Sequence, residues 1–143
     1  MAIKQLSVFV PNKAGELAKI TDALDKANID IRAMSIADTQ DFGILRLIVS
    51  DIDKAKEKLE ESECFASTTD VVAVEISDQP GALGKVLNLL SDNGVSIDYM
   101  YAFIAVSKKG AYVVLRVEDN EKAEKTLIEN KVKIVTEDDI SKL

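Results

Sequence analysis

The stretch Asp78-Gln79-Pro80-Gly81-Ala82-Leu83 decides how this chain folds. It follows an alternating apolar run, Val72 to Ile76, and leads into a helical apolar pattern over residues 83–90. Proline fixes φ and needs no amide partner at a helix start, and glycine has no Cβ to hold another molecule away from the backbone. The first-turn amides of a helix favour an anion such as a carboxylate. The stretch therefore predicts a strand-to-helix turn, which is either a plain tight turn with an Asp cap or a carboxylate-binding loop.

A related stretch, Asn12-Lys13-Ala14-Gly15-Glu16-Leu17, places Gly15 at 66 residues before Gly81. At this spacing the first halves of the two copies match at Val8 and Val74, Lys19 and Lys85, Leu24 and Leu90, Ile31 and Ile97, and Met34 and Met100. The spacing then becomes 68, and the later matches include Leu47 and Leu115, Asp51 and Asp119, and Leu59 and Leu127. A repeat that covers almost the whole chain outranks any local signal. The sequence therefore predicts two domains, residues 1–69 and 70–143.

Each copy has the same predicted order of elements. Alternating apolar residues predict strands at 3–10, 29–37, 42–49, 71–76, 95–106, 111–117 and 132–135, with a short extended segment at 64–68. Helical spacing predicts helices at 14–27, 81–93 and 120–130, one after Asp51 and a short one after Thr136. Hairpin turns are expected at 38–41 and 108–110. The order β-α-β-β-α-β is the split, ferredoxin-like one, so we expect an α+β fold of two such units in tandem, each an antiparallel sheet with helices on one face.

Several residues are expected to begin or end these helices. Asn12, Asp51 and Asp119 are candidate N-caps, and Thr136 with Asp139 has the pattern of a capping box. Asn28 and its repeat equivalent Gly94 are candidates for a left-handed residue after the helix. In the first helix, the apolar face is expected to consist of Leu17, Ile20, Leu24 and Ala27.

Composition excludes several classes of protein. The formal net charge of −7 argues against a nucleic-acid partner, which needs a basic face, and no apolar run approaches the length of a membrane helix. The chain has no His, and its single cysteine, Cys64, cannot form an internal disulfide. The N-terminal residues lack the apolar region of a signal peptide. We therefore expect a cytoplasmic protein.

Catalysis finds little support in the sequence. Without His there is neither an ordinary Ser-His or Cys-His nucleophile nor a His ligand for a metal, and no phosphate-binding loop of the right spacing is present. We expect no enzyme activity, no cofactor and no metal. RNA binding is a further alternative, because Tyr99, Tyr101, Phe103 and Tyr112 stand where stacking aromatics would be needed. The first copy has Ala33, Ser35, Ala37 and Leu45 at those places.

The β-α-β-β-α-β unit carrying this Pro-Gly turn, with Gly94-Val95-Ser96-Ile97-Asp98 at its second strand, resembles the ACT domain. The resemblance covers the whole chain as two tandem ACT domains. The first copy departs from the motif at Ala14, where the second has proline, and at Asn28, where the second has glycine. The resemblance implies a regulatory module that binds an amino-acid effector at an interface between paired domains.

The resemblance also implies which residues bind. One contact comes from the polar residue two positions before the proline, which is Asp78 in the second copy. Its equivalent in the first copy is Asn12. A second polar contact comes from the partner domain, early in its second strand, and is Ser96 or Asp30. Paired domains would then form two unlike sites, one joining Asn12 to Ser96 and the other joining Asp78 to Asp30.

An α-amino acid suits these groups chemically. Its ammonium needs acceptors, which the side-chain oxygens of Asn12 and Ser96 offer, whereas Asp78 with Asp30 would favour a cationic group. Its side chain would meet Tyr99, Tyr101 or Met100. Its carboxylate would take amides at one of two turns, Gly15-Glu16-Leu17 or Gly81-Ala82-Leu83.

The sequence therefore predicts an amino-acid-binding regulatory protein that acts on a separate enzyme of amino-acid metabolism. The alternative is a structural or protein-interaction module with no ligand. Because each copy leaves one sheet face without helices, we also expect the copies to pair edge to edge and the chain to form a homodimer through a sheet face.

Overall fold

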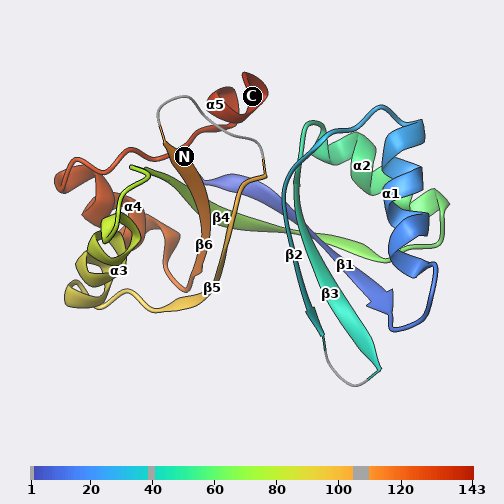
Figure 1. The fold of residues 1–143 in the computed structure, drawn as a ribbon, viewed down its shortest axis with the longest axis horizontal. Helices are drawn as coiled ribbons and strands as arrows, with labels where there is room; N and C mark the ends of the chain where they lie inside the picture. The colour runs from blue at the N-terminus through green and yellow to red at the C-terminus, as the bar shows by residue number, and fades with distance from the viewer. Residues whose placement is uncertain (1, 39–40, 105–109) are drawn as a thin grey trace. The chain divides into compact units, whose positions relative to one another are not determined.

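The computed structural model describes residues 2–38, 41–104 and 110–143. The chain divides into two compact units, a first unit of Lys4–Thr69 and a second unit of Asp70–Leu143 that also includes Ala2 and Ile3. Each has helices on one face of an antiparallel sheet, as the sequence predicted (Figure 1).

The first unit contains β1 (Ile3–Pro11), α1 (Glu16–Lys26), β2 (Ile31–Asp38), β3 (Phe42–Val49) and α2 (Ile52–Glu61). Its strands are arranged in the order β2-β3-β1, and the amide of Phe9 donates to the carbonyl of Phe65 at 3.2 Å on the other side of β1. The alternation of β1 puts Leu6, Val8 and Val10 against the helices.

The second unit contains most of β4 (Ala66–Ile76), followed by α3 (Ala82–Asp92), β5 (Ile97–Ala102), β6 (Ala111–Val117), α4 (Asn120–Glu129) and α5 (Glu137–Ser141). Its strands are arranged in the order β5-β6-β4. Beyond β4, the segment 132–135 is held by a bridge from Val74 to Ile134 and by a 2.8 Å bond from the amide of Val135 to the carbonyl of Ala73.

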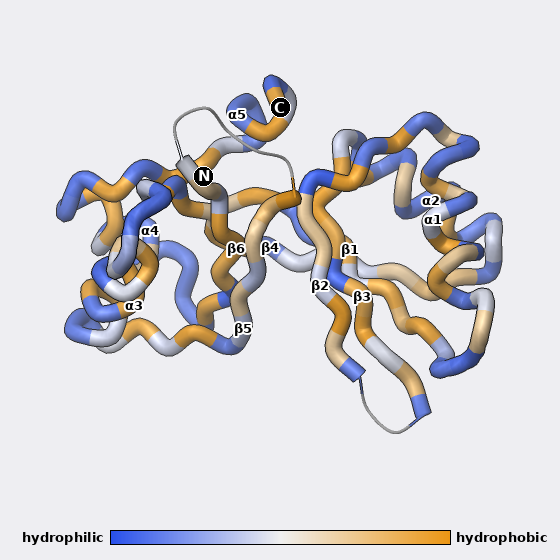
Figure 2. The backbone as a smooth tube through the Cα atoms, in the orientation of Figure 1, coloured by the Kyte–Doolittle hydropathy of each residue, from blue (hydrophilic) through white to orange (hydrophobic). Residues whose placement is uncertain are grey.

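The two copies agree in register as well as in order. Val8 pairs with Leu45 in the first unit, and their repeat equivalents Val74 and Val113 pair in the second. The strand after the first helix carries an irregularity in both units, between Ile31 and Ala33 and between Ile97 and Tyr99. Hydrophobic residues run along β3 and β6, the central strands of their units (Figure 2).

Most of the predicted helix ends are confirmed. The carboxylates of Asp51 and Asp119 each accept a 3.1 Å bond from an amide three residues later, and the capping box of Thr136 and Asp139 is present. Asn28 and Gly94 have left-handed φ values of 56° and 73°. The prediction that Asn12 caps a helix was wrong, because α1 begins at Glu16, after Gly15, with no side-chain cap.

Three other predictions need correction. The extended segment at 64–68 and the strand at 71–76 are one continuous strand, β4. The predicted strand at 95–106 is shorter, and its last residues lie outside the described part of the chain, as do residues 39–40 and 108–109 of the expected hairpin turns. Leu17 is 43 % exposed, so the buried face of α1 consists of Ile20 and Leu24 without it.

Candidate functional site

Both first helices begin at a glycine in the left-handed region. Gly15 has φ of 89° and Gly81 has φ of 86°, and a Cβ built on either would meet no atom within 4 Å. The backbone at these turns is therefore open to an approaching group, and only glycine adopts this conformation without strain. This geometry is the one the Pro-Gly stretch predicts, and it recurs in the first copy although Ala14 replaces the proline.

The turns leave specific amides without acceptors. The amide of Glu16 donates to the carbonyl of Lys13 at 3.4 Å, and the amide of Ala82 donates to the carbonyl of Gln79 at 3.2 Å. The sequence predicted that three consecutive amides at each turn bind a carboxylate. The middle amide of each set, that of Glu16 or Ala82, already has a backbone acceptor. Within the described residues, the amides with no protein acceptor in the first turns are those of Leu17 and Ala18 in α1 and of Leu83 and Gly84 in α3.

A small cavity of about 70 Å³ lies beside the Gly15 turn within the first unit. Asn12 and Leu17, two of the predicted site residues, line it together with Ile36 of β2 and Gly43 of β3. Leu17 and Ile36 are 43 % and 49 % exposed, which is high for large apolar side chains, and they give the cavity an apolar wall. Ile36 was not among the predicted site residues. Its position two residues after Met34 was an available signal, because it puts both side chains on the helix face of β2.

A larger cavity of about 410 Å³ lies at the start of α3 within the second unit. Of the predicted residues, only Ala82 lines it, while Asp78, Gly81 and Leu83 do not. Its charged lining consists of Glu75 from β4, Lys85 from α3, and Lys131 and Lys133 from the segment after α4. Local sequence patterns do not bring these residues together, because the segment after α4 is far from β4 and α3 along the chain.

Ser96 lies elsewhere in the second unit. It lines a cavity of about 510 Å³ with four acidic or amide residues that surround the start of α4, Glu118, Asp119, Asn120 and Glu121. The carboxylate of Asp119 already accepts the Lys122 amide as the helix cap. Lys122 also lines the cavity, so its lining combines three carboxylates with one ammonium.

Asp30, the repeat equivalent of Ser96, already has partners. Its carboxylate lies 2.7 Å from the guanidinium of Arg32, and its amide donates to the hydroxyl of Ser50 at 2.9 Å. The guanidinium of Arg32 therefore offsets part of the negative charge that we expected from Asp78 and Asp30 together.

The expected apolar wall of Tyr99, Tyr101 and Met100 is split between two faces of the sheet. Met100 pairs with Leu115, which belongs to the core under the helices, whereas Tyr101 pairs with Val114 on the other face. Tyr99 and Tyr101 stack with ring centroids 6.4 Å apart, and Tyr101 is buried. Met100 is thus the residue of the three that lies on the helix side, where the Gly81 turn leads into α3.

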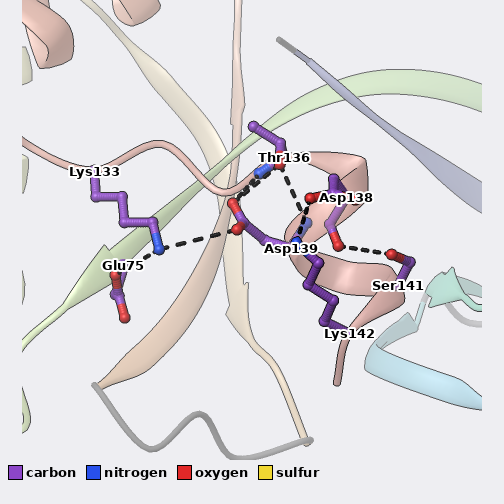
Figure 3. A network of polar contacts seen from close by, with 7 residues as sticks. All are labelled: Glu75, Lys133, Thr136, Asp138, Asp139, Ser141 and Lys142. Carbon is purple, nitrogen blue, oxygen red and sulfur yellow. Dashed lines mark hydrogen bonds and ion pairs between the residues drawn. The ribbon is translucent and has the colours of Figure 1, made fainter.

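A polar network attaches α5 to the edge of the second unit (Figure 3). The ammonium of Lys133 lies 3.3 Å from the carboxylate of Glu75 and 4.0 Å from that of Asp139. The hydrogen bond from Lys133 to Glu75 is the largest cause that raises the pKa of the lysine above its ordinary value. The amide of Thr136 donates to Asp139 at 2.9 Å and, as the largest cause, lowers the pKa of that carboxyl.

No group of three or more His, Cys, Asp or Glu residues in the described part of the chain is arranged to hold a metal ion. None of its helices has the length and hydropathy needed to cross a membrane.

The chain is highly similar to a solved structure. The crystal structure of protein BT0572 from Bacteroides thetaiotaomicron is 44 % identical, covers 100 % of this chain and 98 % of its own, and gives a TM-score of 0.92. The ligand-free regulatory subunit of aspartate kinase from Thermus thermophilus is 19 % identical over 88 % of this chain and 90 % of its own, with a TM-score of 0.62. At that identity it shows a shared fold. No curated protein matches the sequence.

The family comparison agrees with the repeat, the two glycine turns and the topology of both units. The ACT domain pair family matches residues 1–143, the whole length of the sequence. The chain belongs to the ACT domain pair family.

Proposed function

We propose that this protein is a regulatory module that binds a free amino acid at its glycine turns and controls a separate enzyme of amino-acid metabolism. The observation that carries the proposal is the Gly15 turn. The unpartnered amides of Leu17 and Ala18 there are close in sequence to Asn12, whose side chain has no hydrogen bond in the described structure. Membership of the ACT domain pair family supports it.

The chemistry of the Gly15 turn matches the parts of an amino acid. The helix start offers amides and a positive dipole end for the carboxylate. The amide oxygen of Asn12 accepts a hydrogen bond from the ammonium. The apolar wall of Leu17 and Ile36 contacts the ligand side chain, and the cavity of about 70 Å³ favours a small one. The contribution of Ser96 or Asp30 rests on the family resemblance.

A thermal-shift screen of the twenty amino acids tests the proposal. A ligand that binds only the folded protein stabilises it by about 2.7 kcal/mol at a hundredfold excess over Kd, which raises Tm by several degrees. Asn12→Ala should reduce the shift and leave the unliganded Tm unchanged, because Asn12 does not cap α1. Gly15→Val is a poor probe, since a β-branched residue at φ of 89° strains the turn itself.

Asn88→Ala is the matched control, because Asn88 is an exposed residue of α3 that lines none of the three cavities described above. It should keep the full ligand shift. If calorimetry detects no heat and no saturation with any amino acid at millimolar concentration, the binding proposal fails.

A protein-interaction module is the second candidate, and a cluster of three aromatic residues favours it. Phe9 lies with its ring centroid 5.6 Å from that of Phe42 and 6.0 Å from that of Phe65, and Phe65 is 70 % exposed. Phe9 lies between the core residues Val8 and Val10, so it is on the sheet face without helices. Such a surface suits a homodimer, and a dimer is compatible with amino-acid binding.

A further inference from the structure

A row of large apolar side chains crosses the helix-free sheet face of the first unit. Phe65, Phe9 and Ile44 are neighbours in it, because the amide of Phe9 donates to the carbonyl of Phe65 at 3.2 Å and Phe9 pairs with Ile44. Phe42 adds a third ring, with its centroid 5.6 Å from that of Phe9. Phe9 is 47 % exposed and Phe65 is 70 % exposed. These four residues are called the apolar row below, and it is open to solvent.

The equivalent row of the second unit has a different chemistry and is covered. The amide of Glu75 donates to the carbonyl of Lys133 at 3.0 Å, which repeats the backbone bond between the two phenylalanines. Their side chains form an ion pair at 3.3 Å. Tyr112, which pairs with Glu75, takes the place of the isoleucine. The side chain of Glu75 is 12 % exposed and Tyr112 is 7 % exposed, so this row is largely buried.

The short helix α5 is attached to the second row and has no counterpart in the first unit. Asp139 of α5 lies 4.0 Å from the ammonium of Lys133 (Figure 3), and Ile140 of the same helix is 3 % exposed. In the first unit the chain continues from Phe65 directly into β4, so no helix follows. The repeat therefore places a helix on one row and leaves the other row without one.

We propose that the apolar row docks a short amphipathic helix of a partner protein, in the place that α5 takes on the second unit. Large exposed apolar patches mark interaction surfaces, and an apolar helix face is one of their common partners. Because Phe65 stands where the second unit has Lys133, the docked helix carries a large apolar residue where α5 carries Asp139. A carboxylate there would lose water without gaining a cation. This inference names a partner for the protein-interaction candidate above, and it does not depend on amino-acid binding.

Two synthetic peptides of residues 132–143 test the inference, one with the sequence of this chain and one with Asp139→Leu. The side chain of Thr136 accepts the amide of residue 139, so the substitution keeps one of the two capping-box contacts. In NMR titrations the Asp139→Leu peptide should shift the amide signals of the apolar row and leave that of Glu75 in place, because α5 occupies the second row. It should bind about tenfold more tightly than the unchanged peptide.

Three variants of the protein sharpen the test. Phe65→Ser should weaken binding of the Asp139→Leu peptide at least about tenfold, as the loss of an aromatic anchor does. Phe9→Glu combined with Phe65→Lys copies the ion pair of the second unit, so it should reverse the preference to the unchanged peptide. Ile128→Ser is the matched control, because Ile128 is an exposed apolar residue of α4 in the second unit, and it should keep full binding.

The inference is overturned if neither peptide binds at millimolar concentration, or if Phe65→Ser binds the Asp139→Leu peptide as the wild type does. A dimer that Phe65→Ser dissociates and the peptide does not would also overturn it, since a second copy would then occupy the apolar row. Light scattering distinguishes this outcome. Asn12→Ala should bind the peptide as the wild type does, which separates this surface from the amino-acid site.

Discussion

Gly81 and Gly84 lie three residues apart at the start of α3, and they have opposite requirements. Gly81 has φ of 86°, whereas Gly84 lies inside the helix with open space around its Cα. A side chain at Gly81 costs free energy because left-handed backbone crowds a Cβ. A side chain at Gly84 lowers the entropy of the unfolded chain at no steric cost.

Gly81→Ala should therefore destabilise the protein by about 1–2 kcal/mol. Gly84→Ala should stabilise it by about 0.5–1 kcal/mol. Urea denaturation of the two variants measures both changes, and opposite signs are expected. Equal effects would show that the left-handed turn is not maintained in solution.

Asp139 is a residue whose charge is linked to folding. Its pKa is lowered in the folded state, mainly by the amide of Thr136, so the folded protein favours the ionised carboxylate. A group with a lowered folded pKa contributes stability above its unfolded pKa, about 3.9, and that contribution is lost as the pH falls through the folded pKa.

Asp139→Ala should consequently be less stable than the wild type at pH 6, and the difference should shrink as the pH falls below about 4. Urea denaturation at a series of pH values measures this. Asp138→Ala is the control, because the carboxylate of Asp138 pairs with the exposed Lys142 and a surface pair contributes little. A difference for Asp139→Ala that stays constant down to pH 2 would contradict the assignment.

At the scale of the element, α2 and α4 begin in the same way. Asp51 and Asp119 have extended backbone and accept the amides of Lys54 and Lys122 at 3.1 Å. α1 and α3 begin without any side-chain cap. In α2 and α4 an aspartate side chain therefore satisfies one first-turn amide, whereas no side chain does so in α1 and α3.

Asp51→Ala and Asp119→Ala should each cost about 1 kcal/mol, the usual value of an N-cap. Thermal unfolding should show Tm lowered by about 2–4 °C. Asp22→Ala, at an exposed position inside α1, should have no such effect, since alanine favours the helix there. If Asp22→Ala lowered Tm as much as Asp51→Ala or Asp119→Ala, the loss of a helix cap would not explain the effect.

At the scale of the whole molecule, charge and aromatic content act against nucleic-acid binding. The formal net charge is −7, and the places of the candidate stacking residues Tyr99 and Tyr101 are taken by Ala33 and Ser35 in the first unit. Fluorescence anisotropy with single-stranded RNA at physiological salt should show no binding. Sub-micromolar, salt-dependent binding would instead support the RNA-binding alternative.

Self-association is also a property of the whole molecule. We expect a homodimer with about twice the 15.6 kDa mass of the chain, and Phe65, at 70 % exposure, is the residue of the aromatic cluster most available for contact. Light scattering at high protein concentration measures the mass. Phe65→Ser should lower it toward one chain, whereas a wild-type protein that is already monomeric would rule the dimer out.

The sequence by itself determined the repeated architecture, because its signals are local and occur twice. Left-handed turns follow from Gly15 and Gly81, and the caps follow from Asp51 and Asp119, since each depends on a few adjacent residues. The family resemblance depended on the same local motif. The start of α1 was predicted wrongly for a local reason too. Asn12 and Gly15 can both precede a helix, and the turn needs the left-handed conformation that glycine adopts.

Only the tertiary structure decided which side chains share a cavity. Ile36 meets Asn12 and Leu17 because β2 passes beside the start of α1, and sequence spacing does not reveal this. Lys85 and Lys131 converge because the segment after α4 returns beside β4. Tyr99 and Met100 separate because neighbouring strand residues point to opposite faces, and the irregularity after Ile97 changes which ones do. Contacts between distant segments depend on how the chain returns on itself, so the three cavities could not be predicted from local patterns.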